Sequence, residues 1–226
     1  MHYSNIQRAT FLRRPNRFIA HIEVDGREEV CHVKNTGRCR ELLTDRATIY
    51  VEHHDNPNRK TKYSLIAVEK GDLLINMDSQ APNKVVGEWL LEKEPFGKVT
   101  LLKPECTYGS SRFDFYLETE AEKIFIEVKG VTLEEDGIVR FPDAPTERGI
   151  KHLEELCACV EAGYKAVVIF VVQMEGMQHF EPNDKTHPQF GEALRQARKA
   201  GVEVLAYECK VTPSSLEITK SIPVML

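Results

Sequence analysis

The chain has 226 residues, of which 42% are hydrophobic and 29% are charged, and its formal net charge is −5. These values are ordinary for a globular protein, and we find no internal repeat and no low-complexity segment. No apolar run approaches the roughly 20 residues that a membrane helix needs, and the first residues lack the apolar core of a signal peptide. We therefore expect a cytoplasmic protein with no membrane partner.

The six cysteines have no CxxC pair and no regular spacing. This pattern favours reduced thiols over a disulfide framework. The cysteines and histidines between positions 31 and 53 do not follow the spacing of a zinc site.

The net charge is unevenly distributed along the chain. Residues 1–85 carry 14 Lys and Arg against 11 Asp and Glu, a balance of +3, whereas residues 86–226 have a balance of −8. A mildly basic module joined to an acidic one permits a polyanionic partner, although solvated surfaces explain the same numbers.

The first 80 residues are predicted to form short strands separated by turn residues. The predicted strands are Ala9–Leu12, Phe18–Val24, Glu29–Val33, Thr48–His53, Tyr63–Val68 and Leu73–Met77. Asp25-Gly26 is typical of a two-residue hairpin turn. So many short strands in so little sequence favour a small closed barrel, of which the oligonucleotide/oligosaccharide-binding (OB) barrel is one form.

A helix is predicted over residues 81–95, with Val85, Trp89, Leu90 and Leu91 packing inward and Pro95 ending it. Beyond it, strand-like segments alternate with helix-like ones. The strands are Phe113–Glu118, Ile124–Lys129, Ala166–Val172 and Val202–Tyr207, and the helices are Thr146–Ala162 and Pro188–Ala200. This alternation predicts a mixed α/β domain. We place the barrel in residues 1–82 and the α/β domain in residues 83–226.

Residues 112–129 are predicted to form a hairpin with one apolar and one polar face, because side chains alternate along a strand. The predicted apolar face consists of Phe113, Phe115 and Leu117 with Ile124, Ile126 and Val128. Asp114, Glu127 and Lys129 then meet on the other face.

Two carboxylates are hard oxygen ligands suited to Mg²⁺ or Mn²⁺. A neighbouring lysine can orient a water molecule and stabilise the charge that develops on a phosphoryl group. Asp followed by Glu-x-Lys resembles the core motif of the PD-(D/E)xK nucleases, with Phe113 in place of the proline. An exposed Glu–Lys pair on a strand is the alternative interpretation.

Several longer stretches of the sequence resemble a second known family. "FPDAPTERGIKHL", "YGSSRFDF", "NTGRCREL" and "GVEVLAYECKV" closely resemble the sugar fermentation stimulation protein A family, through nearly the whole chain. The resemblance implies an N-terminal OB-like barrel, a C-terminal PD-(D/E)xK nuclease-like domain, DNA binding and a link to maltose-gene regulation. It also allows a homodimer.

Within that resemblance, Asp114, Glu127 and Lys129 match the motif. Glu105 is a candidate for a further metal ligand, with a surface glutamate as the alternative. The helix that begins after Thr146 offers Lys151 to the metal-bound water or the phosphate, unless Lys151 only pairs with Glu147. Arg148 and His152 of this helix are further candidates for phosphate contact.

Basic residues in the first half suit a nucleic-acid phosphate backbone, and neighbouring aromatic residues can stack on bases. Core packing in the barrel is the alternative for Phe11 and Phe18. The candidate nucleic-acid contacts are Arg13, Arg14, Arg17, Asn35, Thr36, Arg38, Arg59, Lys60, Lys62, Arg112 and Arg148.

Two functions remain open from the sequence. The leading hypothesis is a phosphodiesterase dependent on Mg²⁺ or Mn²⁺ that acts on DNA, or alternatively on RNA. The competing hypothesis is a DNA-binding regulator that has kept a nuclease fold without cleaving, although no helix-turn-helix pattern supports sequence-specific binding.

Overall fold

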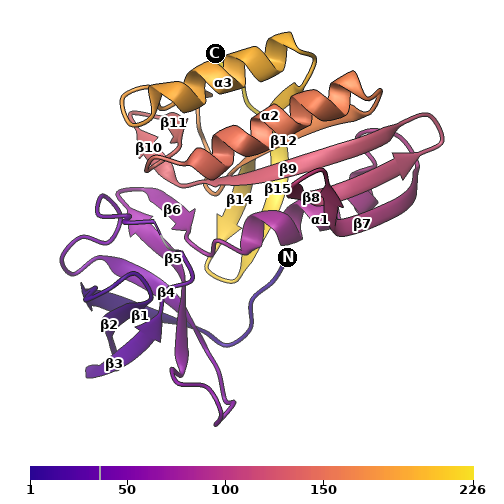
Figure 1. Ribbon diagram of the computed structural model, residues 1–226. Helices are drawn as coiled ribbons and strands as arrows, with labels where there is room; N and C mark the ends of the chain where they lie inside the picture. The colour runs from indigo at the N-terminus through magenta and orange to yellow at the C-terminus, as the bar shows by residue number, and fades with distance from the viewer. Residues whose placement is uncertain (36) are drawn as a thin grey trace.

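A computed structural model describes residues 1–35 and 37–226, which form a small barrel followed by an α/β domain (Figure 1). The barrel strands are β1 (Ile6–Arg13), β2 (Ile19–Val24), β3 (Arg27–His32), β4 (Thr48–His53), β5 (Tyr63–Lys70) and β6 (Leu73–Asn76). They pair in the order β3-β2-β1-β4-β5-β6, and parallel pairing of β3 with β5 closes the barrel. All six predicted strands are confirmed, and so is the OB-type barrel.

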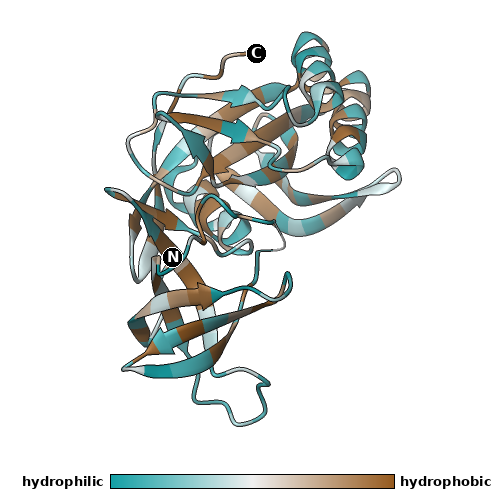
Figure 2. Cartoon of the chain, turned by 90° about the vertical axis from the view of Figure 1, so that its left-hand side faces the viewer, coloured by the Kyte–Doolittle hydropathy of each residue, from teal (hydrophilic) through white to brown (hydrophobic). Residues whose placement is uncertain are grey.

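Alternation of apolar and polar residues gives the barrel its core. Ala20, Ile22 and Val51 are completely buried inside it. Asp25 and Gly26 both have positive φ, 50° and 73°, as the predicted hairpin turn requires. The strands carry most of the hydrophobic residues of the barrel, whereas the β4–β5 loop at its lower end is hydrophilic (Figure 2).

The α/β domain is built on a six-stranded sheet of order β15-β14-β12-β9-β8-β7. Its strands are β7 (Val99–Tyr108), β8 (Ser111–Thr119), β9 (Lys123–Val131), β12 (Lys165–Val172), β14 (Glu203–Thr212) and β15 (Ser215–Ser221). A second sheet contains β10 (Leu133–Glu135), β11 (Ile138–Phe141) and β13 (His179–Pro182). The central β12 is parallel to β9 and to β14 and is almost entirely buried, as its continuous apolar sequence predicts.

Helices cover both faces of the large sheet (Figure 1). Helix α1 (Ala81–Lys93) packs on one face, against Phe115 and Ile126, while α2 (Glu147–Glu161) and α3 (Pro188–Lys199) lie together on the other. The prediction that Leu91 faces inward is wrong: Leu91 is 56% exposed, and Val86 is buried instead. No described helix is long and apolar enough to cross a membrane.

Strands β7 and β15 and the small second sheet were not predicted. The side chains of β7 are mostly exposed, so this edge strand has no buried apolar face to mark it. β10, β11 and β13 have only three or four residues each, too few for a period to show.

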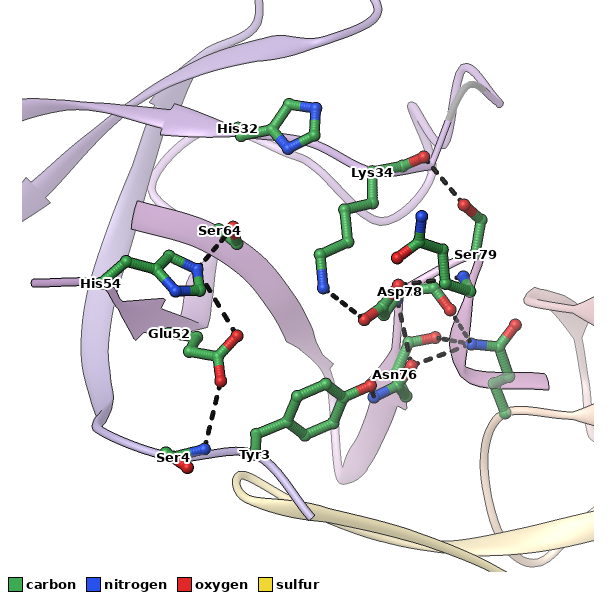
Figure 3. A network of polar contacts seen from close by, with 12 residues as sticks. Tyr3, Ser4, His32, Lys34, Glu52, His54, Ser64, Asn76, Asp78 and Ser79 are labelled. Carbon is green, nitrogen blue, oxygen red and sulfur yellow. Dashed lines mark hydrogen bonds and ion pairs between the residues drawn. The ribbon is translucent and has the colours of Figure 1, made fainter. Parts of the chain in front are cut away.

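A polar junction joins the barrel to the α/β domain (Figure 3). The buried amide of Gln173, which follows β12, donates to the backbone oxygens of Asn76 (3.1 Å) and Asp78 (3.2 Å). Lys34 of the barrel donates to the buried Asp78 carboxylate at 2.7 Å. These contacts fix the segment that leads directly into α1, and α1 in turn contacts the carboxylate cluster described next.

Candidate functional site

Asp114 lies where β8 and β9 separate. The paired register of the two strands ends at Phe115 and Ile126, so the backbone N–H of Val128 lies beyond the ladder. One Asp114 oxygen accepts this N–H at 2.7 Å, and the other accepts the side-chain amide of Asn83 in α1 at 2.6 Å. The carboxylate therefore ties both strands and the helix together.

A close approach of α1 to β9 makes this arrangement possible. A Cβ atom on Gly130 would lie 2.8 Å from Pro82 of α1 and 2.6 Å from the Gln173 amide oxygen. Only glycine fits this position, one residue after Lys129.

Glu127 and Lys129 lie on the face of β9 that α2 covers. The Lys129 ammonium donates to Oε1 of Glu127 at 2.6 Å, and Nδ1 of His152 in α2 bonds the same oxygen. Glu127 is only 3% exposed and His152 only 4%. The alternative of an exposed Glu–Lys pair is thereby excluded.

The electrostatics of the two carboxylates differ. Burial and the nearby negative charge of Glu127 raise the pKa of Asp114, which outweighs the hydrogen bonds from Val128 and Asn83. Burial also raises the pKa of Glu127, but the hydrogen bonds from His152 and Lys129 and the positive charge of Lys129 lower it by more than burial raises it, so the net shift is downward. A buried carboxylate and a half-buried one that repel each other attract a cation.

The donor set suits a hard divalent ion. Oε2 of Glu127 is buried and has no hydrogen-bond partner among the residues that the structure describes. Such an orphaned oxygen is costly unless a ligand satisfies it. No group of three or more His, Cys, Asp or Glu side chains of metal-binding geometry occurs in residues 1–35 and 37–226. Asp114 and Glu127 would thus leave coordination positions to water, as Mg²⁺ sites commonly do.

The predicted apolar face of the hairpin is correct except for Phe113. Phe115, Ile124 and Ile126 belong to the core under α1, as expected. Phe113 instead packs on the α2 side, 5.6 Å from the Phe125 ring and 6.1 Å from the His152 ring between centroids. Separation of β8 from β9 at Asp114 interrupts the strict alternation on which the prediction relied.

Two predicted site residues lie apart from this cluster. Glu105 is exposed and forms an ion pair of 3.5 Å with Arg112, which is also exposed. Lys151 donates to the backbone oxygen of Ser110 at 3.2 Å and lies 4.0 Å from Glu155. Neither makes a described contact with Asp114 or Glu127.

Helix α2 begins as predicted, with the Thr146 hydroxyl accepting the N–H of Gly149 at 3.0 Å. Its buried positions are Gly149, His152, Leu153, Leu156 and Cys159. Ile150, Cys157 and Val160 on the same helix are half-buried. The spacing of Gly149, His152, Leu156 and Cys159 at three and four residues was the signal that identifies His152 as inward-facing.

Arg14 supports the backbone beneath the basic surface rather than contributing its charge to that surface. Its guanidinium donates to four backbone oxygens, those of Arg17, Asn35, Gly37 and Arg38, at 2.7–2.9 Å. This side chain therefore holds the β1–β2 loop against Asn35, Gly37 and Arg38.

Arg17 and Arg38 line two adjoining hollows. The first, of about 520 Å³, lies on the barrel and also contains Phe11, Arg40 and Leu43. The second, of about 510 Å³, extends from Arg17 and Arg38 to the segment Phe141–Thr146, where α2 begins. A smaller hollow of about 120 Å³ then continues from Phe141 and Asp143 to Asn35 and Gly130. We call this series of hollows the basic groove; it leads from the barrel to the end of β9 that carries Lys129.

The remaining predicted contacts are spread over the surface. Arg13 bonds Glu28 and His21, Arg59 bonds the Ser64 hydroxyl at 2.9 Å, and Lys60 and Lys62 are exposed on the β4–β5 loop. Arg148 of α2 is exposed and donates to His152. Thr36 lies outside the described residues.

An OB-type barrel followed by an α/β domain with Asp114, Glu127 and Lys129 at one strand separation defines a two-domain protein with a PD-(D/E)xK nuclease-like fold. The chain belongs to the sugar fermentation stimulation protein family. Residues 80–215 match its "Sugar fermentation stimulation protein RE domain", and residues 12–77 match its "SfsA N-terminal OB domain".

Several relatives are similar over their whole length. Sugar fermentation stimulation protein homologs from Clostridium beijerinckii and Desulfitobacterium hafniense are 59% and 58% identical over 226 residues, covering 100% of this chain and 100% and 99% of those proteins. The solved structure of Pyrococcus furiosus SfsA in complex with Ca²⁺ matches with a TM-score of 0.87 and 27% identity, over 100% of this chain and 98% of that one.

Proposed function

We propose that this protein binds nucleic acid and hydrolyses its phosphodiester bonds with Mg²⁺ or Mn²⁺ as cofactor. The observation that carries the proposal is the buried Oε2 of Glu127, which lies beside Asp114 and has no hydrogen-bond partner in the described part of the chain, two residues from Lys129. DNA is the expected substrate and RNA the alternative.

Asp114 and Glu127 would hold the ion, and the structure of Pyrococcus furiosus SfsA in complex with Ca²⁺ supports a divalent ion in this fold. When bound, such an ion supplies a Lewis acid that neutralises charge on a phosphoryl oxygen. Lys129 has three donors and uses one on Glu127. The others can orient a water molecule and stabilise negative charge on the phosphate.

The basic groove supports a polyanionic substrate. Its exposed Arg17 and Arg38 come from the β1–β2 loop and the segment after β3, and OB barrels use such loops to bind oligonucleotides. Because the groove continues to Gly130, a strand held on the barrel would approach Lys129 and the carboxylates.

The experiment incubates the protein with single-stranded DNA, duplex DNA and RNA, in Mg²⁺, in Mn²⁺ and in chelator. Cleavage that needs the ion and falls at least about 100-fold in both Asp114→Asn and Lys129→Ala supports the proposal. Equal cleavage by these variants indicates a contaminating nuclease. Binding without cleavage under every condition favours the DNA-binding regulator.

A further inference from the structure

His152 is a buried histidine that contacts the candidate ion ligand Glu127 and is itself contacted by Arg148. We propose that His152 is a positioning residue, held by Arg148 in one tautomer, that fixes Glu127 so that its Oε2 is available to a divalent ion. This inference rests on the proposed function, because it assumes that Glu127 is an ion ligand.

The hydrogen bonds determine which imidazole nitrogen carries the proton. The guanidinium of Arg148 is always protonated, and its Nε donates to Nε2 of His152 at 3.3 Å. Nε2 must then be an acceptor, so the ring proton lies on Nδ1. Nδ1 therefore donates to Oε1 of Glu127, in the manner of the outer groups that orient metal ligands.

The two oxygens of Glu127 have different environments as a result. Oε1 accepts from both His152 and Lys129, whereas Oε2 is buried with no partner among the described residues. With one oxygen held twice, the carboxylate cannot rotate to satisfy the other. Oε2 is thus the oxygen left for the ion.

Packing holds the imidazole in this position. The ring meets the Phe113 ring edge to face, at 6.1 Å between centroids and 69° between planes. His152 also lies within the buried stripe of α2, next to Leu153 and one turn before Leu156. A substitution at this site therefore changes hydrogen bonding without offering the side chain a route to solvent.

Two substitutions of His152 distinguish the roles of its two ring nitrogens. The amide nitrogen of asparagine branches from Cγ, as Nδ1 does, whereas that of glutamine is one bond farther, as Nε2 is. His152→Asn can thus still donate to Glu127, and His152→Gln cannot donate from the same place. Calorimetric titration with Mn²⁺ should show affinity about 10–100-fold weaker in His152→Gln and within about threefold of wild type in His152→Asn.

The affinity of the wild type for Mn²⁺ shows whether a negative result rules out the ion site or only the role of His152. If the wild type does not bind Mn²⁺, the proposed ion site is wrong. If the wild type binds and both variants bind equally well, the ion site stands and the role of His152 is wrong. Glu154→Ala, exposed on the same helix, is the matched control and should leave the affinity unchanged.

Substitution of Arg148 gives a second test that leaves the packing of the core unchanged, because Arg148 is exposed. Nitrogen-15 NMR of the histidine rings should show the proton of His152 on Nδ1. The Arg148→Ala variant should lose this fixed tautomer and bind Mn²⁺ several-fold more weakly. A wild-type ring whose Nε2 rather than Nδ1 carries the proton overturns the proposal whatever the variants do.

Discussion

The barrel and the α/β domain place their charged groups in opposite environments. In the basic groove, Arg17 and Arg38 are exposed on loops, where water solvates them at little cost. In the carboxylate cluster, Glu127 is 3% exposed and depends on Lys129 and His152 for its hydrogen bonds. Exposed cations suit a mobile polyanion that binds and leaves, whereas buried carboxylates suit an ion held in one place.

The comparison also distinguishes structural from functional charge. Arg14 donates to four carbonyl oxygens, and Glu134 accepts from Lys70 and the N–H of Gly137, so both side chains have structural partners within the fold. Four buried side-chain atoms of the described residues have no hydrogen-bond partner, among them Nε of Arg14 and Oε2 of Glu127. Oε2 of Glu127 belongs to a carboxylate that interacts with a second carboxylate, Asp114, and such a pair of oxygen donors suits a divalent ion.

The largest expected effect is on the buried pair. Glu127→Ala leaves the Lys129 ammonium and the His152 N–H without their acceptor, and should lower the free energy of unfolding by about 3–5 kcal/mol. Urea unfolding in the presence of chelator measures this loss without any contribution from an ion.

The matched control is an exposed pair. Lys98 and Glu120 lie 4.0 Å apart, and both side chains are 74% exposed. Glu120→Ala should therefore change the free energy of unfolding by less than about 0.5 kcal/mol. Equal losses in Glu127→Ala and Glu120→Ala would show that burial does not distinguish the two environments.

The second prediction concerns the ion itself. Mn²⁺ at about 100 times its Kd should raise the free energy of unfolding of the wild type by about 2.7 kcal/mol, since it binds the folded state alone. Asp114→Asn removes one negative oxygen donor and should lose most of this increase. Stabilisation of Asp114→Asn equal to that of the wild type would place the ion elsewhere.

The third prediction concerns Glu134, whose carboxylate joins the α/β domain to Lys70 of the barrel. Burial raises the pKa of Glu134, but the hydrogen bonds from Lys70 and the Gly137 N–H lower it by more than burial raises it. The net shift of the pKa is therefore downward. Glu134→Gln should lower the free energy of unfolding by about 2 kcal/mol at pH 7.

The pH dependence of that loss has a definite sign. A carboxylate whose pKa is lowered in the folded state stabilises the protein fully above its unfolded pKa of about 4.3. This stabilisation disappears as the pH falls through the lower, folded pKa. Urea unfolding measured from pH 7 to pH 3 should thus show the free energies of unfolding of wild type and Glu134→Gln converging at the acid end. A difference that stays constant with pH would contradict a stabilising role for the ionised Glu134 carboxylate.

Local sequence patterns were sufficient to predict the barrel and the motif. Alternating residues between turns predicted β1–β6, and Asp25-Gly26 has the positive φ that its turn requires. The pairing of β8 with β9 follows from the short connection between them, which is enough to bring Asp114 and Glu127 together.

The rest depends on contacts between distant segments. His152 reaches Glu127 because α2 packs on β9, 25 residues away along the chain, and sequence spacing within the helix does not specify that contact. Arg14 binds the carbonyls of Asn35, Gly37 and Arg38, whose position depends on how the barrel closes. Its basic character alone gave no indication that its guanidinium bonds the backbone at several points.

The fourth prediction concerns the exposed arginines of the basic groove. Each phosphate contact with a single strand contributes about 0.7 to the slope of log K against log salt. Arg17→Gln combined with Arg38→Gln should reduce that slope by about 1.4 for single-stranded DNA, measured by fluorescence anisotropy. Arg198→Gln on α3, far from the barrel in Figure 1, is the matched control and should leave the slope unchanged.

The smallest expected effect is at Arg13, which the sequence predicted as a nucleic-acid contact. Its guanidinium already bonds the Glu28 carboxylate at 2.5 Å, with His21 alongside, so it offers little net charge to a phosphate. Both Arg13 and Glu28 are about half exposed, and exposed ion pairs of this kind contribute little to stability. Arg13→Ala should therefore leave the salt slope unchanged while Arg17→Gln and Arg38→Gln reduce it. A fall of about 0.7 in Arg13→Ala would instead mean that nucleic acid displaces Glu28 and extends beyond the basic groove across β1 and β3.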